Sequence, residues 1–232
     1  FRSCQQIQNY SNLLFDETSN LYSPTEKLDS IFYLSASSSD WARTVLSKID
    51  RNKSTALLRY SNDNARIGAE FLTESGTEFV YIPQTPIADI TTETAWLYNA
   101  VAQFLILEKY SVYDLISEIP VEGDESTKTV SKIEKLLKRF ESAKSEEEAF
   151  CKAVNELAVY LDYSTRPDHL EKLYNTISDS KYFSAFEPDK YQNISITFHS
   201  SKGLEFDQVI VFAEDYRLSD KASLYNHYVA VT

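Results

Sequence analysis

The segment 194–206 reads ISITFHSSKGLEF, and the apolar run VIVF follows it at 209–212. Two short apolar runs separated by polar residues predict two buried strands joined by a loop at the surface. The loop holds a histidine, two serines, a lysine, a glycine and a glutamate, which is more hydrogen-bonding capacity than a simple connection requires. We therefore expect it to bind a ligand that carries phosphate and sugar groups.

The first half of this loop suits a phosphate backbone. Thr197, His199 and Ser200 can hydrogen-bond to phosphate oxygens, and Lys202 adds a positive charge. The alternative is an ordinary connection between strands, with a capping histidine and a solvated lysine. We expect the binding role for the loop as a whole and leave the role of Lys202 by itself open.

The second half of the loop suits a nucleotide. Gly203 permits either an unusual backbone conformation or the close approach of a ligand to the backbone. Glu205 would repel phosphate, but carboxylates accept hydrogen bonds from ribose hydroxyls in other nucleotide sites. The loop therefore combines groups for two different parts of a nucleic acid or a nucleotide.

The remainder of the chain predicts an α/β domain that is interrupted by helices. In the first ninety or so residues, three short apolar runs alternate with helix-period patterns. These runs lie at 31–34, 55–60 and 79–82. Strand, helix and strand in succession imply parallel pairing, with helices on the faces of the sheet. We therefore expect one α/β domain in two parts, 1–90 and 186–232, with an all-helical insertion at 91–185.

Some helices carry recognisable features. Ser111 with Asp114, and Ser145 with Glu148, have the spacing of a capping box and predict helix starts in the insertion. In the α/β part, a helix is expected to follow the run at 55–60 and to end near Gly76.

Composition restricts the class of protein. The 232 residues are 43% hydrophobic, yet no apolar run approaches the roughly 20 residues of a membrane span, so we expect no membrane partner. Cys4 and Cys151 have no metal-ligand spacing around them, which favours a reduced, cytoplasmic protein without a metal site in this chain. The chain has no methionine and begins at Phe1, so we expect it to be a segment of a longer protein.

The formal net charge of −12 argues against a broad surface for polyanions, because phosphate contacts normally require a basic field. A narrow basic track on an acidic body remains compatible with this charge. The acidity favours a protein partner for the outer surface.

The loop resembles a known motif. At every fixed position 197–206 matches TxHxxKGLEF, motif V of the UvrD/PcrA-like superfamily 1 DNA helicases. The run 1–3, FRS, resembles the (Y/F)RS of motif IV, and 228–232, YVAVT, resembles the start of motif VI. His227, just before that run, is expected to be a helix-surface residue without a role. This resemblance implies the second RecA-like motor domain, 2A, interrupted by a reduced helical 2B insertion.

The resemblance also implies roles for individual residues. Arg2 would be a catalytic arginine finger that reaches the γ-phosphate of ATP. Gly203 and Glu205 would face ATP together with Arg2, and the part of the loop from Thr197 to Lys202, including His199 and Ser200, would face single-stranded DNA.

A further segment resembles motif IVa, which often reads Y-R-S-N. This chain has Arg59-Tyr60-Ser61-Asn62, with the first two residues exchanged. Neighbouring residues of a strand point to opposite faces, so either Tyr60 or Arg59 would be the DNA contact. Asn62 and Arg66 keep their places as expected DNA contacts, although Asn62 could instead be a helix N-cap.

Other parts of the helicase pattern are absent from the chain. None of the four glycines belongs to a G-x-x-x-x-G-K-[ST] loop, so ATP and Mg²⁺ would be held mainly by a first RecA-like domain that is not in this sequence. The chain by itself is therefore expected to be inactive.

Several stretches resemble one branch of the family, the helicase subunits of Gabija anti-phage defence systems. They lie at 1–12, 81–86, 110–115 and 226–232. This resemblance implies an ATP-dependent subunit that responds to single-stranded DNA or DNA ends and assembles with an OLD-family nuclease subunit. A general repair helicase and a non-motor interaction domain on the same fold are the two alternatives.

Overall fold

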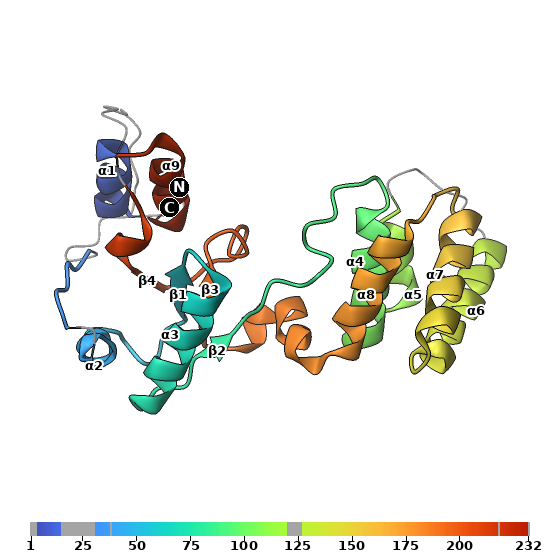
Figure 1. The fold of residues 1–232 in the computed structure, drawn as a ribbon, viewed down its shortest axis with the longest axis horizontal. Coiled ribbons are helices and arrows are strands. Elements are labelled where there is room, and N and C mark those ends of the chain that lie inside the picture. The colour runs from blue at the N-terminus through green and yellow to red at the C-terminus, as the bar shows by residue number, and fades with distance from the viewer. Residues whose placement is uncertain (1–3, 15–30, 38, 120–126, 218, 232) are drawn as a thin grey trace. The chain divides into compact units, whose positions relative to one another are not determined.

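A computed structural model describes residues 4–14, 31–37, 39–119, 127–217 and 219–231. The chain divides into two compact units (Figure 1). We call the first the α/β unit, which comprises Phe1–Ile82 and Asp189–Thr232, and the second the helical unit, 83–188. The expected insertion was 91–185, whereas the helical unit begins eight residues earlier and ends three residues later.

The α/β unit is built on a parallel sheet of four strands, in the order β2-β3-β1-β4. The strands are β1 (Thr55–Arg59), β2 (Val80–Tyr81), β3 (Asn193–Thr197) and β4 (Gln208–Val211). Parallel strands connected through helices fit a RecA-like α/β domain. The prediction of parallel pairing is confirmed, as are the strands expected at 55–60 and 79–82, although β2 is shorter than expected.

The strand expected at 31–34 is wrong. Residues 31–37 form no regular secondary structure, and Phe32 and Tyr33 are 58% and 80% exposed. A strand needs a partner, and in the described sheet β1 already has β3 on one side and β4 on the other. An apolar run of four residues does not by itself reveal whether a place in the sheet is available to it.

Five helical segments lie in the described residues of the α/β unit. They are α1 (Gln5–Leu13), α2 (Trp41–Leu46), α3 (Asn62–Glu74), the short 3-10 helix η3 (Ala213–Asp215) and α9 (Lys221–Val231). Helix α3 packs against β1 and β3, and small residues form the contact. A Cβ on Gly68 would come within 2.5 Å of the Leu57 side chain, and the Ser195 hydroxyl donates to the Ala65 carbonyl at 2.6 Å. The absence of a side chain at Gly68 therefore allows the helix to approach the sheet closely.

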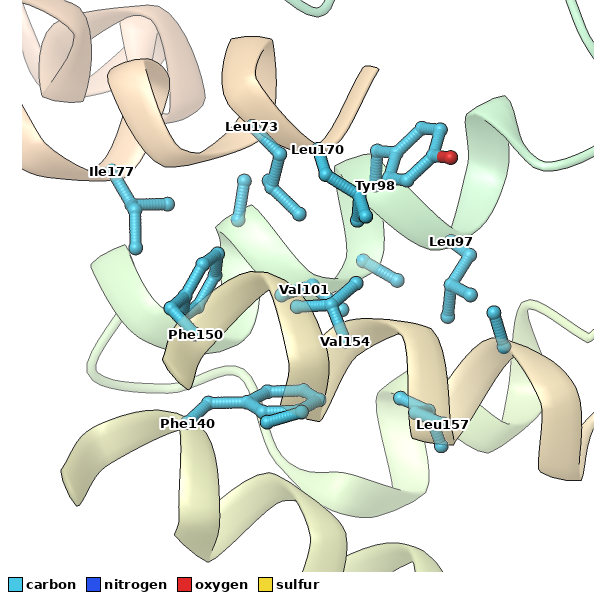
Figure 2. Packing of buried hydrophobic residues seen from close by; sticks show 14 of the residues in the cluster. Leu97, Tyr98, Val101, Phe140, Phe150, Val154, Leu157, Leu170, Leu173 and Ile177 are labelled. Carbon is cyan, nitrogen blue, oxygen red and sulfur yellow. The ribbon is translucent and has the colours of Figure 1, made fainter. Parts of the chain in front are cut away.

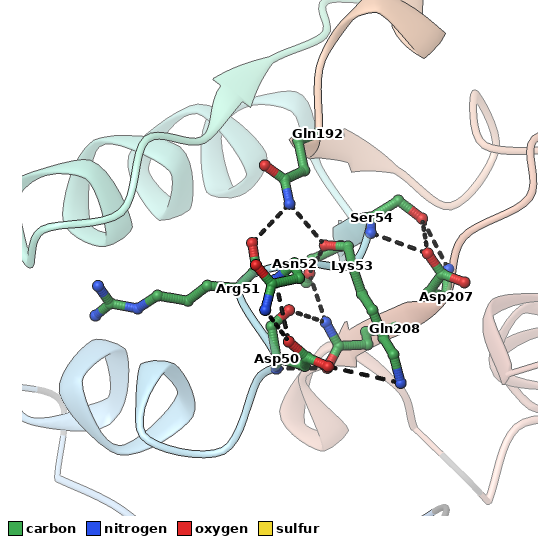
Figure 3. Close-up of polar contacts among 9 residues, drawn as sticks. Asp50, Arg51, Asn52, Lys53, Ser54, Gln192, Asp207 and Gln208 are labelled. Atoms are coloured by element: carbon green, nitrogen blue, oxygen red, sulfur yellow. Dashed lines mark hydrogen bonds and ion pairs between the residues drawn. The ribbon is translucent and has the colours of Figure 1, made fainter.

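Hydrogen bonds of side-chain amides and a carboxylate link the amino ends of three strands (Figure 3). Asp207 accepts from the Ser54 backbone N–H at 3.0 Å and from the Ser54 hydroxyl at 2.9 Å. Gln208 donates to the Asp50 carbonyl at 2.9 Å, and Gln192 donates to the Arg51 carbonyl at 2.6 Å. These contacts join the loop before β1 to the residues that precede β3 and to the start of β4.

The helical unit contains five α-helices in its described residues, followed by a 3-10 helix. They are α4 (Ala95–Ile106), α5 (Val112–Ser117), α6 (Thr127–Ala143), α7 (Glu147–Tyr160), α8 (Pro167–Ser178) and η1 (Ser180–Phe186); a further 3-10 helix, η2 (Pro188–Lys190), crosses the boundary between the units. Phe140, Phe150 and Leu157 are fully buried in the apolar core of this unit (Figure 2). The rings of Phe140 and Phe150 pack edge to face at 6.0 Å. The prediction of consecutive helices without strands is confirmed for the described residues of this unit.

One of the two predicted capping boxes is present. Ser111 and Asp114 form the expected reciprocal hydrogen bonds at the start of α5. At α7 the N-cap is Glu146 rather than Ser145, and its side chain makes no capping hydrogen bond. The helix begins one residue later than predicted, which puts Glu148 at the second helical position instead of the third that a capping box requires.

No helix in the described parts of the chain combines the length and apolar character needed to cross a membrane.

Candidate functional site

Two of the segments expected to bind nucleic acid lie side by side at the carboxyl edge of the sheet. Strands β1 and β3 are parallel neighbours, and Arg59 is paired with Thr197. The Phe198 backbone N–H continues this pairing by donating to the Arg59 carbonyl at 3.1 Å. The segment that begins at Tyr60 and the turn that follows Thr197 therefore leave the sheet at adjacent positions. In parallel sheets this edge is where ligands bind.

The buried part of the turn holds its shape. Thr197 is only 4% exposed, and its hydroxyl donates to the Ser200 hydroxyl at 3.0 Å and accepts from the Ser200 backbone N–H at 3.3 Å. The Ser201 backbone N–H donates to the Thr197 carbonyl at 3.0 Å. Thr197 and Ser200 thus organise the turn from inside, and the direct phosphate contact expected of them from the sequence stays a prediction.

The outer part of the turn presents its polar groups to solvent. His199, Lys202 and Glu205 are exposed. Partial burial, and then the positive charge of Lys202, lower the pKa of His199 below its ordinary value, so its imidazole is neutral at pH 7 and can both donate and accept. The His199 ring packs on Phe198 with 3.9 Å between ring centroids, which fixes where the imidazole lies.

Gly203 is required by its backbone conformation. Its φ is +88°, in the region that side chains with a Cβ rarely adopt, and a Cβ built there would have no atom within 4 Å. Of the two roles that the sequence allowed for this glycine, the structure gives direct support to the conformational one. The open space around it leaves room for a ligand beside the backbone.

Arg59 and Tyr60 point in different directions, as neighbours on a strand do. Arg59 is engaged inside the unit: its Nε and Nη2 donate to the Asp215 carboxylate at 2.6 and 3.0 Å, and its guanidinium lies 3.9 Å from the centre of the Phe212 ring. The two paired side chains are 11% and 6% exposed. Tyr60 is 52% exposed. The aromatic side chain, and not the cation, is therefore the one available at this strand end.

The start of α3 corrects one alternative from the sequence. The N-cap is Ser61, whose hydroxyl accepts from the Asn64 backbone N–H at 3.2 Å, so the interpretation of Asn62 as the N-cap is wrong. Asn62 is exposed at the first helical position, and its side-chain oxygen Oδ1 accepts from the Tyr81 hydroxyl at 3.2 Å. Arg66 pairs with Glu70 at 2.6 Å on the exposed side of α3.

Some residues of the helicase-like motifs fall outside the described parts of the chain. Arg2 and the last residue of the motif VI-like run, Thr232, lie outside the described residues. Within the described residues there is no group of three or more His, Cys, Asp or Glu side chains that could hold a metal ion.

Sequence reasoning missed several residues that shape the site. Asp215 holds Arg59 and also accepts from the Tyr60 backbone N–H at 3.1 Å. Tyr216, next along the chain, is 4% exposed and packs against Phe198 with 6.1 Å between ring centroids. An acidic residue that follows an apolar strand at the carboxyl edge of a parallel sheet was the available signal, since Asp215 comes soon after VIVF.

Comparison with known proteins adds a relative. No protein-family model matches the chain. The chain is 30% identical over 240 aligned residues to the Gabija protein GajB of Bacillus cereus (strain VD045), and the alignment covers 100% of the chain and 47% of the relative. The chain therefore spans about half the length of this curated relative. Over its whole length, the chain is related in sequence to a Gabija protein.

Proposed function

We propose that the chain is the second motor domain of an ATP-dependent UvrD-like DNA helicase or translocase that acts in a Gabija-type defence system. The observation that carries this proposal is the pairing of Arg59 with Thr197, because it brings the motif IVa-like and motif V-like segments together at the carboxyl edge of a parallel sheet. Two segments far apart in the sequence would not need to meet there if their resemblance to helicase motifs were accidental.

The side chains at this edge suit a single strand of DNA. Tyr60 offers an exposed ring on which a base can stack, and Lys202 offers a charge for phosphate. His199 and Asn62 are exposed hydrogen-bonding groups on the same two segments. Stacking and phosphate contact are tolerant of sequence, as a translocase requires. The buried Thr197 and Ser200 keep the turn in the shape that presents His199 and Lys202.

The ATP side of the proposal rests on fewer residues. Exposed Glu205 can accept from the ribose hydroxyls of ATP, and the open space at Gly203 admits a ligand beside the backbone. Arg2 would donate to the γ-phosphate as an arginine finger. ATP hydrolysis would supply the free energy for movement along DNA. Mg²⁺ would be held by groups outside this chain.

The proposed biological setting follows from the relative. We place the chain in the DNA-sensing NTPase subunit of a Gabija-type complex, with an OLD-family nuclease subunit as its partner. Identity of 30% along the whole chain supports this setting, and the net charge of −12 suits a protein partner on the outer surface. Co-purification of the intact protein with the product of a neighbouring nuclease gene tests it. Stable isolation without a nuclease would favour a general repair helicase.

The role of Arg2 is tested in the intact protein. Arg2→Ala should reduce DNA-stimulated ATP hydrolysis by about 10³-fold, because an arginine finger stabilises charge on the transferred phosphoryl group. Residual activity close to that of the unsubstituted protein would contradict this role. An intact unsubstituted protein with no DNA-stimulated hydrolysis would favour a non-motor interaction domain.

The DNA face is tested by the salt dependence of binding. Lys202→Ala should weaken binding to single-stranded DNA and lower the slope of log affinity against log salt by about 0.7, the value for one phosphate contact on a single strand. The matched control is Lys135→Ala, an exposed lysine of α6 in the helical unit, which should leave the slope unchanged. Equal slopes for the two variants would remove Lys202 from the DNA contact.

A further inference from the structure

His227 is buried in the α/β unit, which corrects the expectation that it lies on a helix surface without a role. It belongs to α9 and is only 5% exposed. Its Nε2 lies 2.7 Å from the hydroxyl of Tyr10, which belongs to α1 near the other end of the chain. This hydrogen bond joins the helix that follows the motif IV-like segment to the helix that carries the motif VI-like segment. A buried polar contact of this kind calls for a structural or functional explanation.

The same histidine belongs to a continuous series of ring contacts. The series begins at the exposed Tyr60 and ends on α1, and each ring packs against the next. The centroid distances are 5.8 Å for Tyr60–Phe198, 6.1 Å for Phe198–Tyr216, 4.7 Å for Tyr216–His227 and 5.8 Å for His227–Tyr10. Phe198 is the first residue of the turn proposed to face DNA, so the series connects that turn with α1 and α9.

Two polar atoms inside this series have no hydrogen-bond partner among the described residues. They are Nδ1 of His227 and the hydroxyl of Tyr216, and both are buried. An unpaired buried polar group is unfavourable, so two of them on neighbouring rings are not expected without a reason. The two rings that carry these atoms pack against each other with 4.7 Å between their centroids, which makes the Tyr216 hydroxyl the candidate second partner of His227. His227 therefore has two possible hydrogen-bond partners and uses only one of them here.

We propose that Tyr10 and His227 are a positioning pair that couples α1 and α9 to the 198–203 turn through Tyr216 and Phe198. This rests on the proposed function, in which α1 follows the residue that senses ATP and the turn contacts DNA. A contact with two discrete arrangements is what coupling between two sites requires, because each ligand can favour one arrangement. None of the four side chains needs to touch either ligand.

The chemistry of His227 suits such an exchange. Burial lowers the pKa of its imidazole and raises the pKa of the Tyr10 and Tyr216 phenols, so all three groups are neutral at pH 7. A neutral imidazole donates from one ring nitrogen and accepts at the other, and each phenol can do either. Partners can therefore be exchanged without moving a charge into the interior.

The coupling itself is tested by hydrogen exchange in the intact protein, without any ligand. Tyr10→Phe removes only the hydroxyl and keeps the ring. It should raise exchange by about fivefold or more, the lower end of typical coupling effects, at the Ser200, Ser201 and Leu204 amides, which are hydrogen-bonded within the turn. The exchange rates of the β1 amides should not change, and that result would exclude a general loss of stability. The matched control is Tyr113→Phe, whose ring is 69% exposed in the helical unit.

A second variant and a functional measurement complete the test. His227→Phe keeps a ring and removes the same contact from the other side, and the double variant should show no greater effect on the turn than either single variant, because both remove one bond. In the ATPase assay, Tyr10→Phe should lower the ratio of hydrolysis with DNA to hydrolysis without DNA by about fivefold. Turn amides that exchange at the unsubstituted rate in both single variants would overturn the proposal. A protein without DNA-stimulated hydrolysis would overturn the proposed function while the exchange result still decides the coupling.

Discussion

The interiors of the two units differ in the kinds of side chain that they bury. The helical unit encloses an extensive apolar core around Phe140, Phe150 and Leu157, and its described buried polar residues are Thr94, His169 and Thr176. The described residues of the α/β unit include an apolar cluster around Leu57 and Leu72, and this unit also buries the Arg59–Asp215 ion pair and the polar contact of His227. An apolar core stabilises without directing any particular group, whereas buried polar pairs hold individual side chains in place. The difference indicates that the helical unit gains stability by packing and that the α/β unit uses its interior to position a site.

The largest expected effect separates stability from activity in the helical unit. Phe140→Ala removes a fully buried ring and should lower the free energy of unfolding by about 3–5 kcal/mol. Hydrogen exchange at α6 and α7 amides in the intact protein measures this, because the two units need not unfold together. DNA-stimulated ATP hydrolysis by the folded protein should be unchanged. A parallel loss of that activity would mean that the helical unit takes part in the reaction.

The second expected effect concerns the buried ion pair of the α/β unit. Arg59→Ala leaves Asp215 as an unpaired buried charge and should lower the free energy of unfolding by about 3 kcal/mol, at the lower end for buried pairs because the guanidinium keeps some exposure. The matched control is Arg66→Ala, since that arginine pairs with Glu70 at the surface and should contribute no more than about 0.5 kcal/mol. Denaturant unfolding of the α/β unit compares them, and similar losses would contradict the structural role of Arg59.

A smaller effect is expected where α3 approaches the sheet. Gly68→Ala puts a methyl group against Leu57 and should destabilise the α/β unit by about 1–3 kcal/mol, the usual range for an overpacked contact. Alanine favours a helix more than glycine does, so the measured loss should fall toward the lower end. Ile67→Ala, next to it on the exposed side, should cost less. A stabilising Gly68→Ala would show that the helix and the sheet can separate without loss.

The smallest effect is a dependence of stability on pH. Burial lowers the pKa of His227 in the folded protein, so the unfolded chain binds a proton at higher pH than the folded one. Stability should therefore be fully retained above the ordinary histidine pKa of about 6.5 and should decrease as the pH falls below it. Tyr10 and Tyr216, which pack on the ring, stay neutral throughout this range. Below pH ~6.5, the free energy of unfolding of His227→Gln should depend less on pH than that of the unsubstituted protein.

Much of the fold was predictable because it follows local patterns. Alternating apolar runs and helix periods gave the parallel sheet and the series of helices correctly. The error at 31–34 arose because the sequence does not show which strand occupies an edge. The displaced start of α7 arose because several adjacent polar residues could each begin the helix.

In the candidate site, the exposure of the outer groups agrees with the sequence, and their binding roles stay predictions. The residue types in 197–206 pointed to His199, Lys202 and Glu205, which are exposed on the turn. Nothing local indicated that Arg59 would turn inward, since its partner Asp215 lies 156 residues further along the chain. The contact of Tyr10 with His227 spans 217 residues and was equally invisible to patterns of short range.

Asp215 restricts the conformational freedom of the end of β1. Its carboxylate holds the Arg59 side chain and the Tyr60 backbone N–H together, so the end of β1 is already ordered before any ligand arrives. A strand of DNA that stacks on Tyr60 would then lose little affinity to the freezing of protein motions. Preorganisation of this kind lets a weak and sequence-tolerant contact form and dissociate quickly, as the proposed translocation along a strand would require.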